Sequence, residues 1–264
     1  MKPLPIARDA GEDIAPEARW TWPLRLLQWA WLMVLVTWLG VLSLGWNLIA
    51  LVLKPFLRGD TARRVGRAGV AYGYRFYWAC ARASGLMRLE AESLDALREV
   101  SGGLVIAANH PSLLDALMIV ARLPRSGCIM KGSLVRNPFL RAGASLAGYV
   151  PNDSARTMVR LAVEQLQEGC QLVAFPEGTR SPSPRQIHPF SRSIALIAQR
   201  AQVPIQTVVI ETDSPYLAKG WPLWKLPPVP IVFSARLGPR FEPDADPEEL
   251  SARMEDYFRQ ELRP

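Results

Sequence analysis

Cysteine and histidine are scarce in this 264-residue chain, which has three cysteines and two histidines. Cys80, Cys128 and Cys170 are odd in number and widely spaced, so a disulfide framework is not expected and a reducing compartment is indicated. The chain has no metal-ligand spacing, and we therefore expect no metal site. Because imidazole chemistry has only His110 and His188 available, a histidine-dependent site has to be built around one of these two.

Charge is missing from one long stretch near the amino terminus. No charged residue occurs from Leu26 to Leu53. As a helix this stretch is about 42 Å long, compared with roughly 30 Å for the hydrocarbon core of a bilayer. Its length and the acidic residues before it argue against a signal peptide. Tryptophans are spread along it and do not form two belts, so two interpretations stay open: a tilted span, or a helix in one leaflet bent near residues 43–47.

The next segment, residues 61–85, mixes arginines with tyrosine, phenylalanine and tryptophan, which is typical of an interfacial amphipathic helix. The basic residues Arg58, Arg63, Arg64 and Arg67 predict that the side following the apolar stretch is cytoplasmic. We therefore expect a bacterial-type inner membrane location with the rest of the chain on the cytoplasmic face. Residues 1–16 are acidic and unpatterned, and we predict a mobile tail there.

A net charge of +7 favours anionic partners. A membrane surface, a phosphorylated substrate and an acidic carrier protein all fit this charge. Nucleic acid is anionic too, but the chain has no recognised nucleic-acid motif, so we expect no nucleic-acid partner.

After residue 85 the pattern alternates between strand-like and helix-like stretches, which predicts an α/β fold with helices on both faces of a sheet. The expected strands cover residues 103–108, 127–131, 170–175, 204–210 and 230–237. The expected helices cover residues 112–123, 137–146, 153–168, 190–202 and 246–261.

The first motif, Asn109-His-Pro-Ser-Leu-Leu-Asp115, directly follows a strand-like stretch. A histidine beside a carboxylate can take a proton from a hydroxyl at neutral pH, because the carboxylate fixes the ring tautomer and stabilises the imidazolium. The same residues also fit a helix capping box, in which Asp115 accepts from the backbone N–H of Ser112. From the local sequence alone the two interpretations are equally good.

The second motif, Phe175-Pro-Glu-Gly-Thr-Arg180, also follows a strand-like stretch. Gly178 permits a close backbone approach, and the guanidinium of Arg180 can bind a phosphate through two hydrogen bonds. The alternative is a strand-to-loop turn with a solvated arginine. Since α/β sheets bind ligands beyond the carboxyl ends of their strands, the two motifs could face one crevice.

Together with the apolar stretch, these motifs resemble the glycerolipid acyltransferase family, which includes lysophosphatidic acid acyltransferases. The family's first block, Asn-His-x-Ser-x-x-Asp, is matched at Asn109, His110, Ser112 and Asp115, and its third block is matched at all six positions. The resemblance covers roughly residues 85–240. It implies a mixed sheet flanked by helices, as in glycerol-3-phosphate acyltransferase, with an amino-terminal pair of membrane-embedded helices. The expected domains are therefore membrane-binding helices at 17–85 and an acyltransferase domain at 86–264.

This resemblance also implies a function in phospholipid biosynthesis. An acyl group passes from acyl-CoA or acyl carrier protein, as co-substrate and without a further cofactor, to a lipid hydroxyl such as that of lysophosphatidate. His110 and Asp115 are the implied catalytic residues. The expected substrate-binding residues are Asn109, Ser112, Lys131, Arg156, Glu177, Gly178, Thr179 and Arg180.

Two departures from the family pattern affect the expected phosphate site. The family's second block ends in an arginine, where this chain has Ser154, with Arg156 two residues later; its later Phe-Lys-x-Gly pattern reads Phe190-Ser-Arg-Ser193 here. Loss of one phosphate ligand removes on the order of 1.5–3 kcal/mol of binding. An acceptor without phosphate, such as a specialised lipid or pigment, is therefore an alternative. Two further alternatives for the function are a non-catalytic membrane lipid-binding protein and a lipid hydrolase.

Overall fold

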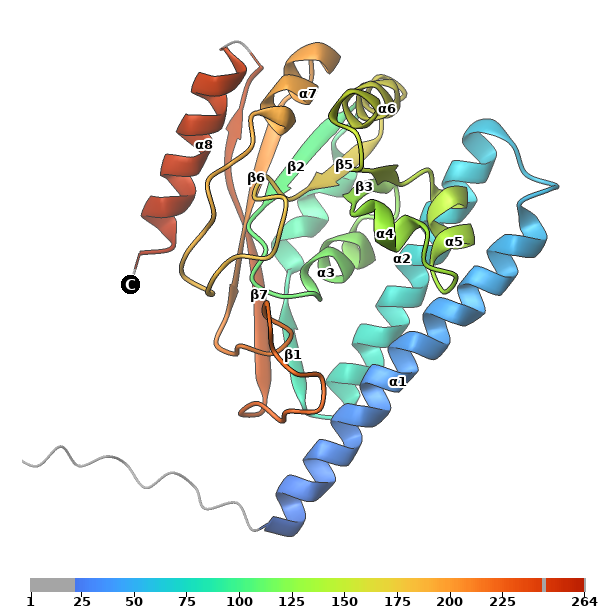
Figure 1. Ribbon diagram of the computed structural model, residues 1–264, viewed down its shortest axis with the longest axis vertical. Helices are drawn as coiled ribbons and strands as arrows, with labels where there is room; N and C mark the ends of the chain where they lie inside the picture. Colours follow the sequence, from blue (N-terminus) through green and yellow to red (C-terminus); the bar gives the residue numbers. More distant parts are fainter. Residues whose placement is uncertain (1–21, 244–245, 264) are drawn as a thin grey trace, which may run out of the picture.

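The computed structural model describes residues 22–243 and 246–263; the expected tail at residues 1–16 lies outside the described residues. A seven-stranded sheet lies between two layers of helices, and a long amino-terminal helix lies along the outside of one layer (Figure 1). In spatial order the strands are β1 (Met87–Glu90), β7 (Ile231–Phe241), β6 (Ile205–Thr212), β2 (Leu104–Ala108), β5 (Gln171–Ala174), β3 (Ser126–Met130) and β4 (Val150–Pro151).

Only the β6–β7 pair is antiparallel among the described strand pairs; the other neighbours run parallel. The sheet is therefore mixed, as predicted. Because β6, β2, β5, β3 and β4 run in one direction, their carboxyl ends meet at one edge of the sheet. Both sequence motifs begin at this edge, directly after β2 and β5.

Strand β2 is buried on both faces, and its alternate side chains enter two separate cores. Ile106 packs in the core beneath α2 (Gly59–Ala83), α3 (Asp115–Arg122) and the 3-10 helix η1 (Glu92–Glu99). Val105 packs on the opposite face beneath α6 (Ala155–Gln167), α7 (Ser193–Ala201) and α8 (Pro247–Glu261). Helices therefore cover both faces, as the alternating pattern predicts.

Helix α1 (Trp22–Leu53) has a mean hydropathy of 1.9 in its most apolar window, and only 17% of that window is buried. Within residues 22–243 and 246–263 it is the one helix long and apolar enough to cross a membrane. Helix α2 differs from the interfacial helix expected at residues 61–85. Its Tyr77 and Trp78 are buried in the core, and the Trp78 ring meets Phe233 of β7 edge-on at 5.6 Å between centroids. A membrane-embedded helical pair is thus not shown, because α2 lies between α1 and the sheet (Figure 1).

Arg67, one of the four basic residues used to assign the cytoplasmic side, does not face solvent. It is buried at 7% exposure, where its Nε donates to the carbonyl of Ala147 at 3.1 Å and its Nη2 donates to Oε1 of Gln165 at 3.0 Å. Arg63 is paired with Glu168 at 2.8 Å. The sequence could not show which of these arginines is buried, because a run of basic residues has the same composition whether its side chains face solvent or bind carbonyl groups.

The predicted strands and helices are all present, with bounds that shift by a few residues. The helix expected at residues 137–146 appears as α5 (Arg141–Ala147). Helix α4 (Gly132–Val135) lies before that range and was not predicted; the turn between the two helices contains Pro138, whose ring cannot continue a helix. The short strands β1 and β4 and the helix η1 were not predicted. Two to four residues of strand carry too little alternation to be recognised without their partners.

Candidate active site

The loop that follows β2 carries His110 to the carboxyl edge of the sheet. Nδ1 of His110 lies 2.9 Å from Oδ2 of Asp115, at the first residue of α3. The same Oδ2 accepts a hydrogen bond from the backbone N–H of Ser112 at 2.7 Å. The two interpretations of this motif are therefore compatible, since one carboxylate oxygen both caps the turn and contacts the histidine. Helix α3 begins at Asp115, three residues after the expected start.

Asp115 is fully buried, and its second carboxylate oxygen, Oδ1, has no hydrogen-bond partner among the described residues. Burial raises the pKa of this carboxyl above its ordinary value of 3.8, and the hydrogen bond with His110 acts in the opposite direction. An unpartnered oxygen in an apolar surrounding leaves the charged form dependent on His110 and Ser112. The imidazole and the carboxylate therefore form one hydrogen-bonded unit.

Phe175 restrains the histidine from the second motif. Its ring stacks on the imidazole of His110 with 4.0 Å between centroids and an interplanar angle of 19°. The His110 side chain remains 17% exposed, and Nε2 makes no hydrogen bond with any described residue. A ring held by Asp115 on one nitrogen and by Phe175 on one face leaves Nε2 available to a ligand.

Glu177 lies beneath this site, at 8% exposure. Its Oε1 accepts from the backbone N–H of His110 at 3.0 Å and from the hydroxyl of Ser181 at 2.6 Å, and its Oε2 accepts from the backbone N–H of His188 at 2.9 Å. Both carboxylate oxygens are thus used internally. Glu177 thus joins the segments that contain His110, Ser181 and His188, an arrangement that the predicted substrate-binding role did not include.

Asn109 is likewise used internally. Its Nδ2 donates to the carbonyl of Ile210 at 2.8 Å, and its Oδ1 accepts from the N–H of Ile210 at 2.7 Å. The hydroxyl of Ser112 donates to the carbonyl of Tyr216 at 3.1 Å. Asn109 thus joins the end of β2 to β6, and Ser112 joins the histidine turn to the segment after β6. Both were expected to bind substrate.

The remainder of the second motif forms a turn on the surface. Gly178 has φ +65° and donates its N–H to the carbonyl of Phe175 at 3.0 Å, a conformation that glycine adopts without strain. Thr179 is exposed. Nη1 of Arg180 donates to the carbonyls of Leu217 and Ala218, at 2.8 and 3.1 Å. Nε and Nη2 of Arg180 have no hydrogen-bond partner in the part of the chain that the structure describes.

The three remaining basic and polar positions lie along the same edge of the sheet. Lys131 directly follows β3 and is exposed. Ser154, at the place of the expected arginine, is the N-cap of α6 and accepts from the N–H of Thr157 at 3.5 Å. Arg156 is exposed in the first turn of that helix. Ser154 therefore has a structural role that an arginine could not take.

Sequence reasoning missed several residues that shape the site. Ser181 both donates to Glu177 and accepts from the backbone N–H of His110 at 3.1 Å. His188 and Leu217 contribute backbone groups, which no sequence pattern marks. Ser181 directly follows the second motif in the sequence, and this position was the only feature that could have predicted its place in the site. None of the described residues forms a cluster of three or more His, Cys, Asp or Glu side chains able to hold a metal.

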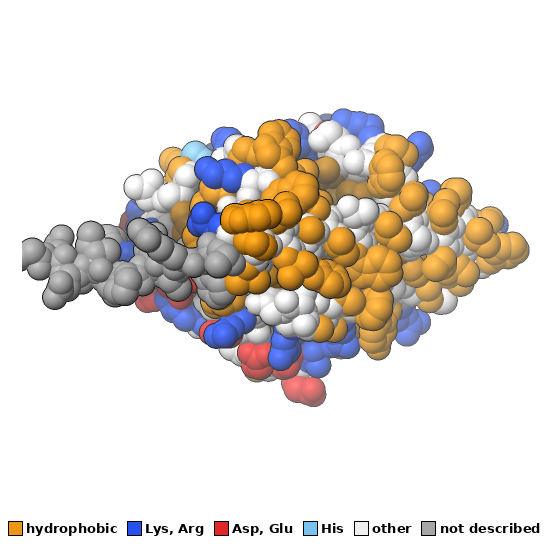
Figure 2. All heavy atoms as spheres, turned by 90° about the horizontal axis from the view of Figure 1, so that it is seen from below, with side chains coloured by type: hydrophobic (Ala, Val, Ile, Leu, Met, Phe, Trp, Pro, Cys, Tyr) orange, Lys and Arg blue, Asp and Glu red, His pale blue; other side chains and the backbone are white. Residues whose placement is uncertain are grey.

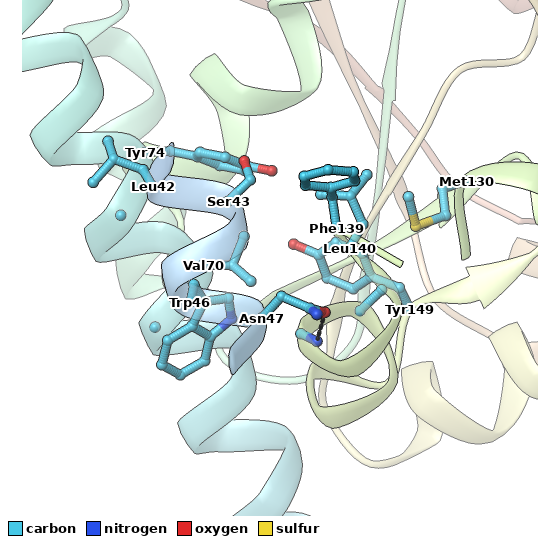
Figure 3. A pocket seen from close by; sticks show the side chains of 14 residues that line it. Leu42, Ser43, Trp46, Asn47, Val70, Tyr74, Met130, Phe139, Leu140 and Tyr149 are labelled. Carbon is cyan, nitrogen blue, oxygen red and sulfur yellow. Dashed lines mark hydrogen bonds between the residues drawn. The ribbon is translucent and has the colours of Figure 1, made fainter. Parts of the chain in front are cut away.

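A small apolar cavity of about 60 Å³, partly open to solvent, lies between α1, α2 and α5 (Figure 3). The hydroxyl of Tyr149 points toward its middle and is buried without a partner among the described residues. Asn47 closes the lower side, where its Oδ1 accepts from the N–H of Gly143 at 3.3 Å. The cavity contains none of the motif residues, but Met130 at the carboxyl end of β3 borders it.

A family profile described as Acyltransferase matches residues 88–211, which contain both motifs and the strands that carry them. Residues 88–211, somewhat less than half of the chain, therefore match the acyltransferase family. The matched range begins within β1 and ends within β6, so the helices α1 and α2 lie before it.

Relatives and a solved structure agree with this assignment. The acyltransferase domain is 31% identical over 116 residues to the 1-acyl-sn-glycerol-3-phosphate acyltransferase of Helicobacter pylori, covering 42% of this chain and 49% of that protein. It is 31% identical over 126 residues to the human 1-acyl-sn-glycerol-3-phosphate acyltransferase alpha, covering 44% of this chain and 43% of that protein. The match thus spans about half the length of these relatives.

The fold of the acyltransferase is also that of a known crystal structure. The 1-acyl-sn-glycerophosphate acyltransferase PlsC from Thermotoga maritima superposes with a TM-score of 0.67, covering 91% of this chain and 95% of that one. At 23% sequence identity this likeness shows the shared fold.

Proposed function

We propose that this protein is a membrane-bound acyltransferase that moves a fatty acyl group from acyl-CoA or acyl carrier protein to a lipid hydroxyl. The observation that carries the proposal is the 2.9 Å contact between Nδ1 of His110 and Oδ2 of Asp115, with Nε2 left available. We assign catalysis to these two residues. Glu177, Asn109 and Ser112 are positioning residues. Glu177 binds the backbone of His110, and the side chains of Asn109 and Ser112 bind the backbone of Ile210 and Tyr216.

In the proposed reaction the acceptor oxygen attacks the thioester carbonyl carbon while Nε2 of His110 takes the hydroxyl proton. The tetrahedral intermediate then collapses, the carbon–sulfur bond breaks, and the thiolate leaves as a thiol with the proton that His110 returns. Asp115 accepts from Nδ1–H throughout, which keeps Nε2 unprotonated at the start and stabilises the imidazolium. No acyl-enzyme is needed, since the thioester is already activated.

A phosphate-bearing acceptor such as lysophosphatidate is the first candidate substrate. The relatives named above are 1-acyl-sn-glycerol-3-phosphate acyltransferases, and three cationic side chains lie along the carboxyl edge here. Arg180 has Nε and Nη2 available for a phosphate, whereas Lys131 and Arg156 are exposed and can supply charge. The apolar cavity bordered by Met130 has a lining that suits part of an acyl chain.

A neutral acceptor is the second candidate, and one observation favours it. Ser154 occupies the place of the family's second phosphate-binding arginine and is used as a helix N-cap. Nη1 of Arg180 is also committed to two carbonyls, so fewer donors remain for phosphate than the motif suggests.

The deciding experiment measures transfer of a labelled acyl group by purified wild-type, His110→Ala and His188→Ala proteins. His188→Ala is the matched control, because it removes the other imidazole and keeps the backbone N–H that binds Glu177. Wild type and control should transfer, and His110→Ala should lose roughly 10²–10⁴-fold in kcat. Comparable activity in His110→Ala, with the same thermal unfolding, would refute the mechanism.

Donors and acceptors are varied in the same assay. Acyl-CoA is compared with acyl carrier protein, and lysophosphatidate is compared with a monoacylglycerol that lacks phosphate. Preference for lysophosphatidate identifies the phosphate-bearing class, and preference for the monoacylglycerol identifies the neutral class. Release of free fatty acid with no acceptor present would identify a hydrolase, in which water replaces the alcohol.

The orientation in the membrane forms part of the same proposal. Helix α1 supports membrane attachment, and the basic residues Arg58, Arg63 and Arg64 after it favour a cytoplasmic location for the acyltransferase domain. A cysteine introduced at the exposed Asp256 of α8 reports the side. An impermeant maleimide should label Asp256→Cys in inside-out vesicles and not in right-side-out vesicles, and the reverse result would overturn the assignment.

A further inference from the structure

The segment between β6 and β7, residues 213–230, projects an apolar tip. The N–H of Lys225 donates to the carbonyl of Pro222 at 3.1 Å and closes a four-residue turn. Leu223 and Trp224 are the two central residues of this turn, and they are 47% and 70% exposed. Such large apolar side chains at a turn tip leave a considerable apolar area in contact with water unless something covers it.

This tip is attached to the amino-terminal half of α1. The indole Nε1 of Trp29 donates to the carbonyl of Trp224 at 2.8 Å. Around this contact, α1 exposes Trp22 at 77% and Trp31 at 51%. In the view from this end of the molecule, apolar side chains extend across one face in a broad band (Figure 2). The turn and the exposed side of α1 are therefore parts of one apolar surface.

Cationic side chains accompany the turn. Nζ of Lys225 lies 4.5 Å from the centroid of the Trp221 ring, and the Trp221 indole donates back to the carbonyl of Lys225 at 3.1 Å. Lys219 is exposed in the same segment. Tryptophan and lysine beside exposed apolar tips are the composition of the boundary between lipid headgroups and acyl chains.

The same segment contacts the catalytic turn directly. The carbonyl of Leu217 accepts from the N–H of Leu113 at 3.2 Å and from Nη1 of Arg180 at 2.8 Å. Leu113, between the motif residues Ser112 and Leu114, is itself 45% exposed. A continuous chain of contacts therefore runs from the apolar tip to the residues beside His110.

We propose that residues 213–230 form a second lipid-contacting element, in which Leu223 and Trp224 insert into an anionic bilayer beside α1 and hold the catalytic edge at the lipid surface. The continuity with the apolar side of α1 favours a bilayer over a protein as the occupant. The flanking Lys219 and Lys225 match the negative surface potential of such a bilayer. This inference concerns the surface and holds whichever acyl donor or acceptor the site uses.

The test uses the full chain, with Cys80→Ser, reconstituted into vesicles of phosphatidylcholine and phosphatidylglycerol. A nitroxide on Trp224→Cys is compared with one on Asp256→Cys, an exposed position on α8. The Trp224→Cys label should collide more with oxygen than with a water-soluble nickel chelate, and the Asp256→Cys label should show the opposite. Leu223→Cys provides an independent second position if Trp224→Cys misfolds.

Two outcomes would overturn the proposal. In one, both the Leu223→Cys and Trp224→Cys labels are as accessible to the nickel chelate as the α8 label. In the other, these labels stay accessible in vesicles and become shielded only when acyl carrier protein is added, which would make the surface a protein-docking site. Neither outcome depends on transfer activity, so a failure here is distinguishable from a failure of the proposed function.

A functional comparison completes the design. The double variant Leu223→Glu/Trp224→Glu should lose about tenfold or more in transfer to an acceptor embedded in vesicles, and remain close to wild type with the same acceptor in detergent micelles. An equal loss in both settings would mean that the turn serves only the protein structure.

Discussion

Glu177 holds the backbone of His110, although 67 residues separate them in the sequence: Oε1 of the glutamate accepts from the histidine N–H at 3.0 Å. The contact joins the two motifs, which follow the neighbouring parallel strands β2 and β5. The second motif therefore does more than provide Arg180. Its Glu177 fixes the backbone position of His110, and its Phe175 stacks on the imidazole ring.

Replacing Glu177 by alanine should destabilise the protein and reduce its activity. The variant leaves the N–H of His188 and the hydroxyl of Ser181 without their acceptor, and it removes one of the two acceptors of the His110 N–H. Each buried group left unsatisfied costs about 1–3 kcal/mol. Thermal unfolding in detergent, together with a transfer assay, measures both effects.

The matched control is Glu168→Ala, which removes only the half-exposed ion pair with Arg63 and should cost less than about 1 kcal/mol. Equal unfolding temperatures for the Glu177 and Glu168 variants would contradict a positioning role for Glu177.

Asp115→Asn should separate stability from catalysis. Burial raises the pKa of Asp115 above 3.8, so the folded state holds this proton more tightly than the unfolded state does. The stability that the carboxyl contributes is then fully present below about pH 4 and is lost as the pH rises through the folded pKa. Asparagine has no proton to lose at this position. The free energy of unfolding of Asp115→Asn should therefore increase relative to that of wild type as the pH rises above about 4.

Activity should move in the other direction, with kcat of Asp115→Asn falling roughly 10²–10⁴-fold because the tautomer of His110 is no longer fixed. Unfolding at a series of pH values, with transfer assays beside it, checks both parts. A pH-independent difference in stability would show that Asp115 is not the group responsible.

Gly66→Ala should strongly destabilise the contact between α2 and α5. A Cβ at Gly66 would lie 2.3 Å from the backbone nitrogen of Ala147, and a backbone cannot move aside cheaply. We expect a loss of about 1–3 kcal/mol in the free energy of unfolding. The control in the same helix is Gly73→Ala, where nothing lies within 4 Å and the higher helix propensity of alanine should add up to about 1 kcal/mol. Similar effects of the two substitutions would contradict the close packing of these helices.

Ser154→Arg tests the altered acceptor site. The substitution removes the N-cap of α6, which should cost about 0.5–2 kcal/mol, and restores a phosphate ligand worth on the order of 1.5–3 kcal/mol. KM for lysophosphatidate should therefore fall by about tenfold or more, with little change for a monoacylglycerol. Ser154→Asp keeps a capping oxygen without the cation, so it should leave stability near wild type. An unchanged ratio of the two KM values in Ser154→Arg would mean that this position does not face the acceptor.

The local patterns predicted most of the fold because its main strands and helices are long enough to show their periodicity. Strand β2 and helix α8 appear close to their expected bounds. The pattern of helix α2 did not separate its two sides: Tyr77 and Trp78 are buried between α1 and the sheet, whereas Tyr72 and Phe76 are exposed. The distinction depends on what covers the helix, and no local pattern contains that information.

The sequence by itself determined the α/β order, the apolar length of α1 and the nearness of His110 to Asp115, because each of these depends on residues within one segment. Only the tertiary structure decided which polar groups remain free for a ligand. Asn109, Ser112 and Glu177 match the family motif as well as His110 does, yet their hydrogen bonds are taken up by Ile210, Tyr216 and His188 from distant segments. A side chain's partners are fixed when the strands assemble, since buried polar groups must then find acceptors and donors within the protein.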